Sequence, residues 1–334
     1  MHGDTKVARS LYRTALREIR RLPIEYLRQF FRLKVGDDVR GIFDAKLESV
    51  QASRTKRVQS EVRNLQRANH GHVNAFQHVM QTAYGRRGRL KWEILRPLRT
   101  GPGAQPPPPI IPVIESSRPP VWSSEIMALV TSDISRKKAL KADSILVPPT
   151  IPKERLDPQS TESQTLGPFS KRREVNARWK FFQHQLDKTL FPLQITLHQR
   201  TEDNKVTVQT DQAALMAAGA RGIGLQGAGV FEELEALSSP PGVARLEASS
   251  AQGDRDDTRQ VLPTIRSHLP RRFLRRRFQE TLAQIPVLAY TLPSGRYKVT
   301  LSPSASTRNG PIQSVVDETD LAWLERAKMG KGGG

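Results

Sequence analysis

The chain of 334 residues contains no cysteine. This absence excludes disulfide bonds, zinc and iron–sulfur sites held by thiolates, and catalysis by a thiol nucleophile. Aromatic residues are few, at 6%, and hydrophobic residues reach 37%, which is below the usual level of a globular protein. Since no run of about 18 apolar residues occurs, we expect no segment that spans a membrane.

Acidic residues are in the minority, with 33 Asp and Glu against 53 Lys and Arg and a formal net charge of +20. Such a charge favours an acidic partner, which would be nucleic acid, an anionic membrane or an acidic protein. The excess is concentrated near the start of the chain, because residues 1–99 hold 22 basic and 9 acidic side chains.

The first 35 residues are rich in arginine, poor in acids and patterned as a helix, which is typical of a mitochondrial transit segment. A basic first helix of a folded domain has the same profile. Both interpretations hold if this helix is a targeting segment that is not cleaved. No uninterrupted apolar stretch follows Met1, so a secretory signal peptide is not expected.

Proline and glycine divide the chain. The segment TGPGAQPPPPIIP, residues 100–112, favours an extended spacer, and the sequence stays rich in Pro and Ser up to residue 170, with one short helix expected within 123–142. We predict a mainly α protein with a three-helix domain over residues 1–99, a linker over 100–170, and a smaller α+β region with helices and a β-hairpin over 171–334. Within the last region, residues 211–260 are expected to form a loose insertion, because they are rich in Ala, Gly, Ser and acids.

Apolar spacing predicts the elements of the C-terminal region. Alternating stretches on either side of TEDN, residues 201–204, predict a hairpin, and two more strands are expected around Pro-Ser-Gly, residues 293–295. A basic helix is expected between Pro270 and Pro286, and a short one over 317–328. One further helix is predicted by a single apolar stripe: Val175, Trp179, Phe182, Leu186 and Leu190.

The first helix carries two stripes. The apolar stripe consists of Leu11, Ala15, Ile19 and Leu22, and the basic stripe consists of Arg9, Arg13, Arg17 and Arg20. Like charges one turn apart repel by a few tenths of a kcal/mol per pair. The basic stripe is therefore either an ordinary solvated face or a docking surface for an acidic partner.

Two more helices complete the first domain in this interpretation. Pro23 ends the first helix, and Gly36-Asp37-Asp38 is expected to kink the second, with an Asp capping a fresh helical start. A third helix is predicted over residues 52–83 from its apolar stripe, which includes Val58, Leu65 and Phe76. Three such helices with short connections form a small antiparallel bundle.

Two short motifs lie in this domain. The first is the tripeptide Leu-Tyr-Arg at residues 11–13, on the first helix. The second is VRGIFDAK, which supplies Arg40, Phe43 and Lys46 on the second helix. Over residues 5–96 the chain resembles the LYR-motif proteins of mitochondria, in which an Arg and a Phe of the second helix accompany the tripeptide. With its long C-terminal half it looks most like the longer fungal members, including those linked to copper tolerance.

The resemblance implies an adaptor or assembly factor of the mitochondrial matrix, not an enzyme. Such proteins bind the acidic mitochondrial acyl carrier protein, whose acyl-phosphopantetheine arm inserts between the helices, and they assist a respiratory, iron–sulfur or ribosomal client. The chain would thus bring no cofactor of its own. By matching positions, Leu11 and Phe43 would line the acyl tunnel or only the core. The residues implied to face the carrier protein or the phosphate of its arm are Tyr12, Arg13, Arg17, Arg40 and Lys46.

Other motifs are weaker. His70 and His72 do not share a helix face, and His78 lies two turns from His70, so we predict no metal site there. The sequence Gly222-x-Gly224-x-x-Gly227 lacks the preceding strand that a dinucleotide site requires. We identify no set of catalytic Ser, His and Asp residues.

The alternative function is that of a basic mitochondrial RNA- or ribosome-associated protein. RRFLRRR, residues 271–277, together with RRGRLK, residues 86–91, supplies arginines suited to RNA phosphates. The arginines concerned are Arg271, Arg272, Arg275 and Arg276. A basic helix that only buttresses the fold explains the same pattern.

Overall fold

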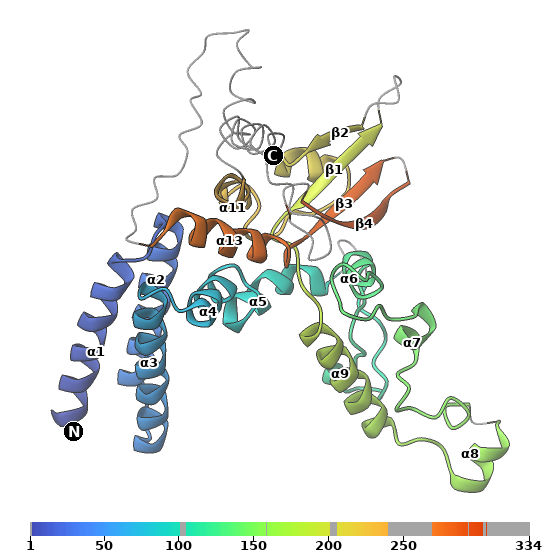
Figure 1. Cartoon of the computed structure of the whole chain (residues 1–334). Coiled ribbons are helices and arrows are strands. Elements are labelled where there is room, and N and C mark those ends of the chain that lie inside the picture. Colours follow the sequence, from blue (N-terminus) through green and yellow to red (C-terminus); the bar gives the residue numbers. More distant parts are fainter. Residues whose placement is uncertain are drawn as a thin grey trace, which may run out of the picture.

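The computed structural model describes residues 2–100, 105–157, 159–200, 206–239, 269–292, 294–302 and 305. Its first three helices stand side by side, with the N-terminus at their lower end in Figure 1. They are α1 (His2–Arg20), α2 (Glu25–Phe43) and α3 (Glu48–Asn69). Two shorter helices follow at an angle to them, α4 (Val73–Ala83) and α5 (Gly88–Leu95), and the 3-10 turn η1 (Arg96–Arg99) ends this part of the chain.

The two stripes of α1 lie as the sequence predicts. Ala15, Ile19 and Leu22 are buried, and Leu11 is half-buried against the same core. The four arginines of the basic stripe are exposed.

The second helix differs from the prediction, because α2 runs through Gly36 without a new start. Its buried residues recur every three or four positions on both sides of the glycine: Leu27, Phe31, Val35, Val39 and Ile42. A glycine inside a helix costs about 1 kcal/mol. That is less than burying any one of these side chains provides, so the helix continues.

The predicted third helix is two helices. Gly71 has φ +79, and the backbone N–H groups of Gly71 and His72 donate to the carbonyls of Ala68 and Arg67. These two bonds form a Schellman cap, which needs a residue in the left-handed region and therefore favours glycine. The chain turns at this point, so α4 crosses the bundle instead of extending α3.

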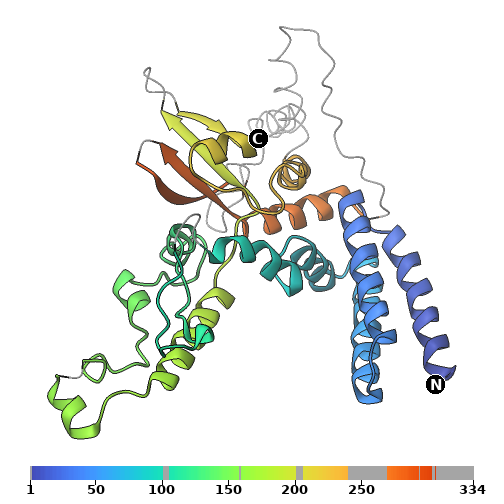
Figure 2. The same ribbon diagram turned by 180° about the vertical axis from the view of Figure 1, so that it is seen from behind.

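The segment expected to be a linker takes part in the core. It contains the turn η2 (Glu115–Ser117) and the helices α6 (Ser124–Val130), α7 (Ala142–Leu146) and α8 (Thr161–Leu166). Ile126, Leu129 and Val130 are fully buried, and Trp122 packs edge-on against Phe182, with 4.7 Å between ring centroids. The Pro-rich composition concealed these few well-spaced apolar residues. Figure 2 shows that α7, α8 and α9 (Lys171–Asp187) extend away from α1–α3.

A four-stranded sheet forms the C-terminal region, in the order β2-β1-β3-β4. The two predicted strand pairs are confirmed, because β1 (Ile195–Arg200) pairs antiparallel with β2 (Val206–Gln209), and β3 (Pro286–Leu292) with β4 (Arg296–Leu301). The parallel pairing of β1 with β3, in which Ile195 lies beside Leu288, joins the two hairpins. The expected helix over 317–328 lies outside the described residues.

Between the hairpins lie α10 (Gln212–Ala217), α11 (Val230–Ser238) and α13 (Arg271–Leu282). The segment expected to be a loose insertion is ordered up to residue 239, since Leu215, Phe231 and Leu234 are buried. Residues 240–260 of that prediction lie outside the described part. The expected basic helix is confirmed as α13, which starts directly after Pro270.

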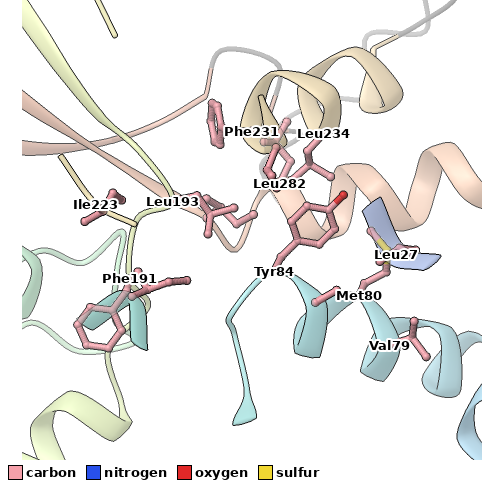
Figure 3. Close-up of a cluster of buried hydrophobic side chains, with 14 of the residues drawn as sticks. Leu27, Val79, Met80, Tyr84, Phe191, Leu193, Ile223, Phe231, Leu234 and Leu282 are labelled. Atoms are coloured by element: carbon pink, nitrogen blue, oxygen red, sulfur yellow. The ribbon is translucent and has the colours of Figure 1, made fainter. Parts of the chain in front are cut away.

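A continuous hydrophobic core joins the N-terminal helices to the C-terminal region. Figure 3 shows Met80 and Tyr84 at the end of α4 beside Leu234 of α11 and Leu282 of α13. The C-terminal half therefore packs directly on the helical domain. Within the described ranges, no helix is both long enough and apolar enough to cross a membrane.

Candidate functional site

The helical domain has one end that the rest of the described chain leaves uncovered. Because α1 and α2 are antiparallel, the start of α1, the end of α2 and the start of α3 meet there (Figure 1). We call this the open end and define it by six of its exposed side chains: Val7, Arg40, Phe43, Lys46, Leu47 and Val50. Beside them, Asp44 and Glu48 are also exposed.

Four of these six side chains are apolar. The exposed fractions are 43% for Val7, 45% for Phe43, 65% for Leu47 and 36% for Val50. Single exposed apolar residues are ordinary, and a larger exposed apolar area rimmed by charge is typical of a protein or ligand contact. Four such residues at one end make the open end a candidate docking surface.

The basic residues beside them are held only weakly by the domain itself. Arg40 pairs with Asp37 at 3.1 Å, but both side chains are mostly exposed, at 79% and 62%. Such a pair contributes between zero and about 1 kcal/mol and exchanges readily for another partner. By contrast, the guanidinium of Arg54 donates to the carbonyl of Gly41 and fixes the end of α2 to α3.

The outer face of α1 presents the basic stripe. Arg9, Arg13 and Arg17 line a surface hollow of about 390 Å³ together with Lys6, Ser10 and Thr14. The acid within the stripe, Glu18, turns inward and is only 9% exposed, because it accepts a hydrogen bond of 2.8 Å from Asn69 Nδ2 of α3. The positive charge of the stripe therefore faces solvent with little compensation.

The sequence-predicted residues fall into two groups. Leu11 and Tyr12 are half-buried against the core, and Leu11 lies nine residues, or roughly 13 Å, along the helix from its first residue. Arg40, Phe43 and Lys46 lie together at the open end, with Arg13 and Arg17 exposed on α1. Phe43 differs from a core residue, because nearly half of its side chain is exposed.

A second basic surface occupies the opposite end, where α13 begins on the corner between α3 and α4. A Cβ placed on Gly71 would lie 3.5 Å from Leu269 Cδ2, and the rings of Phe76 and Phe273 pack edge to face at 5.6 Å. We call this the junction end and define it by Arg20, Arg67, His70, His72, Arg271, Arg272 and Arg276, all exposed. Arg275 is half-buried at its border.

The prediction that residues 86–91 join this basic surface is wrong for Arg86. This residue is 7% exposed and donates to the carbonyls of Tyr84 and Gln284, both at 3.1 Å, at the other end of α13. No ion pair reaches it among the described residues, and burial lowers the pKa of its guanidinium to about 9. Arg86 thus ties the helical domain to the C-terminal region instead of facing a partner.

The weaker motifs have structural roles. The loop around Gly222 and Gly227 is fixed by Gln226, whose side chain bonds both the N–H and the carbonyl of Ile195 at 2.8 Å. Ring Nδ1 of His78 lies 3.3 Å from Nη1 of Arg87. In the described part of the chain, no group of three or more His, Asp and Glu side chains is arranged to hold a metal ion.

These features define a basic helical domain with an exposed apolar end. Residues 11–95 match the family model described as LYRM2-like, LYR motif-containing protein 2-like. The match begins at Leu11 itself and ends at Leu95, the last residue of α5. These residues therefore form a domain of the LYR-motif family. No curated protein and no solved structure was found to match the chain.

The LYR-motif family consists in general of mitochondrial adaptor and assembly proteins. Its members are typically not enzymes, and they typically associate with acyl carrier protein.

Proposed function

We propose that this protein is a mitochondrial matrix adaptor whose open end and basic stripe bind acylated acyl carrier protein, and which acts in the assembly or stability of a client complex. The observation that carries the proposal is the exposed Phe43 between two exposed basic residues, Arg40 and Lys46, in the LYR-motif domain.

The basic and the apolar residues of that surface suit different parts of the acylated carrier protein. Arg40, Lys46 and the basic stripe suit the acidic surface of the carrier protein and the phosphate of its phosphopantetheine arm. The acyl chain suits the apolar residues of the open end, since each buried CH₂ contributes about 0.8 kcal/mol. In this proposal the carrier protein supplies the only prosthetic group.

The route of the acyl chain leads from Phe43 toward Leu11. Two small residues of α1, Ala8 and Ala15, are fully buried in the core between α1 and its neighbours. A small outward movement of α1 would open a channel along these alanines. We therefore assign Leu11 and Tyr12 to the wall of the channel, and Arg13 and Arg17 to contact with the carrier protein.

The test measures binding of the full-length protein to carrier protein in its apo, holo and myristoyl forms, by calorimetry at 50 mM salt. We expect the myristoyl form to bind most tightly. The double variant Arg40→Glu/Lys46→Glu should lose about 100-fold or more in affinity, because like charges across an interface cost several kcal/mol. The matched control is Arg89→Glu on α5, where an equally exposed arginine pairs with Glu93.

Equal binding of all three forms would contradict the role of the apolar residues, and a variant with wild-type affinity would contradict the role of Arg40 and Lys46. The client is identified separately, by capture of the protein from nuclease-treated mitochondria. Persistence of the carrier protein after nuclease treatment distinguishes this function from the alternative, an RNA- or ribosome-associated protein whose partners are bridged by RNA.

A further inference from the structure

We propose that the junction end is a second binding surface and that its ligand is the phosphate backbone of RNA. The surface is assembled from three parts of the chain: the end of α1, the corner between α3 and α4, and the first turns of α13. It lies at the opposite end of the bundle from Phe43.

Contacts between these elements bring the arginines together. Asn69 Nδ2, at the end of α3, donates to the carbonyl of Glu18 at 2.9 Å, which places the last turn of α1 beside the corner. Leu269 lies against Gly71 within the corner, and Arg271 and Arg272 follow two and three residues later in the first turn of α13. Arginines that are about 200 residues apart in sequence thus share one surface.

The charge of this surface is almost uncompensated within the described residues. No ion pair there involves Arg67, Arg271 or Arg272, and Glu18 is turned into the bundle. Glu280 of α13 is used by Arg277, at 2.7 Å. A surface of this kind attracts a polyanion, because each phosphate neutralised releases condensed counterions.

Among the described residues of this surface, the small number of exposed apolar side chains favours RNA over an acidic protein as the ligand. Among the exposed large hydrophobic residues, Val73 is the one that lies on the α3–α4 corner, whereas the open end has four. The centre of a protein–protein interface is apolar and depleted of charge, while interfaces with nucleic acid are polar and strongly positive. Guanidinium groups also match phosphate in geometry.

The helix that carries the arginines, α13, is held against α4 by several side-chain contacts. Phe273 packs on Phe76, and two side-chain pairs continue the contact between α13 and α4: Gln77 with Glu280 at 3.4 Å, and Gln81 with Gln284 at 3.3 Å. A hollow of about 470 Å³ beside these contacts is lined by Arg67, His72, Val73, Asn74 and Ala75. A preformed surface loses little conformational entropy on binding, which favours affinity.

The experiment uses the full-length protein and a fluorescein-labelled single-stranded RNA of 20 nucleotides, in an anisotropy titration at 50 and 200 mM KCl. Wild-type protein should bind, and its affinity should fall steeply with salt. The variant Arg67→Gln/Arg271→Gln/Arg272→Gln should bind at least tenfold more weakly at 50 mM KCl. The slope of log K against log salt should decrease by about 2, since each contact with a single strand contributes about 0.7.

The control variant, Arg32→Gln/Lys56→Gln/Arg57→Gln, removes the same charge from exposed positions elsewhere on the helical domain and should bind RNA nearly as wild type. Thermal melting followed by circular dichroism verifies that both variants are folded. Wild-type protein that does not bind this RNA at 50 mM KCl would overturn the proposal, as would equal losses in the two variants.

A parallel titration with myristoylated carrier protein separates the two surfaces. The triple variant at the junction end should keep its affinity for carrier protein. If it loses that affinity and retains RNA binding, the junction end is a protein interface and the RNA proposal is wrong. Failure of carrier protein to bind wild-type protein would concern the open end alone and leave the RNA result to stand by itself.

Discussion

At the open end, Phe43 and Leu47 remain exposed, whereas at the junction end Phe76 is fully buried under Phe273 of α13. Both ends belong to the same bundle and both carry exposed basic residues. The C-terminal region covers the apolar residues of one end only, and there it adds arginines of its own. The C-terminal region therefore gives the two ends of one small bundle different chemical character.

The largest expected effect on stability comes from Phe76, and Phe43 at the open end provides the contrast. Phe76→Ala should lower the free energy of unfolding by about 3–5 kcal/mol, because it removes a buried ring at the contact with α13. Phe43→Ala should change it by about 0.5 kcal/mol or less and should weaken binding of acylated carrier protein. Urea unfolding of the full-length protein measures both, and similar losses in the two variants would abolish the distinction between the ends.

A smaller effect is expected at the contact between α1 and α3. Asn69 is 2% exposed and donates to both the backbone and the carboxylate of Glu18. Asn69→Ala leaves these acceptors buried without that donor, and we expect a loss of about 1–3 kcal/mol in unfolding free energy. Asn74→Ala, on the exposed side of α4, is the matched control and should change stability by less than about 0.5 kcal/mol. An equal loss of unfolding free energy in Asn74→Ala would contradict the role of the hydrogen bonds between Asn69 and Glu18.

Alkaline pH tests whether the C-terminal region really covers the helical domain. Burial, reinforced by Glu233 of α11, raises the pKa of Tyr26 and Tyr84. Burial also raises the pKa of Tyr297, which bonds Glu125 at 3.3 Å. A raised pKa stabilises the folded state below the unfolded value of 10.0, and this stabilisation is lost as pH rises above it.

Arg86 acts in the opposite sense, since burial lowers its pKa to about 9 and its destabilising charge is relieved above that pH. Three tyrosines outweigh one arginine, so we expect the unfolding temperature to fall between pH 10 and 11.5. Absorbance at 295 nm should show Tyr26, Tyr84 and Tyr297 ionising only above pH 10. Ionisation of Tyr26 and Tyr84 near pH 10 would show that the end of α4 is not covered.

The smallest effect on stability is expected for Arg13→Glu. The change relieves repulsion with Arg9 and Arg17 and should leave the free energy of unfolding unchanged or raise it by a few tenths of a kcal/mol. If the basic stripe binds carrier protein, the same change places like charges across the interface and should abolish binding. A variant that binds acylated carrier protein with native affinity would show that the stripe is an ordinary solvated face.

Local patterns predicted a good part of this structure. The stripes of α1, the two strand pairs and the basic helix after Pro270 depend on neighbours in sequence, so spacing and proline positions were sufficient. The same reasoning failed at two glycines. Gly36 lies within a continuing apolar stripe and is helical, while Gly71 adopts a positive φ and ends α3. What separates the two glycines is the surface against which the following residues pack. That surface comes from distant parts of the chain, so the sequence around each glycine does not reveal it.

The candidate sites also divide into one that the sequence predicted and one that depends on long-range contacts. Residues 11–13 and Arg40, Phe43 and Lys46 were found from the sequence because they form a motif on two adjacent helices. The junction end was predicted only as a basic segment at 271–277. Its combination with Arg67 and His72 depends on the contact of α13 with α4, between residues about 200 positions apart. The prediction for Arg86 was wrong for the same reason, because this residue is buried by a contact with Gln284, which lies far away in sequence.

By itself the sequence determined that the first hundred residues form basic amphipathic helices of the LYR-motif type, because charge and apolar periodicity are properties of a single helix. Only the tertiary structure decided which end of those helices remains open and which is covered. The parallel pairing of β1 with β3 and the packing of Phe273 on Phe76 determine which end is covered. Such long-range contacts are selected by the complementarity of whole buried surfaces, which exists only once the chain has folded.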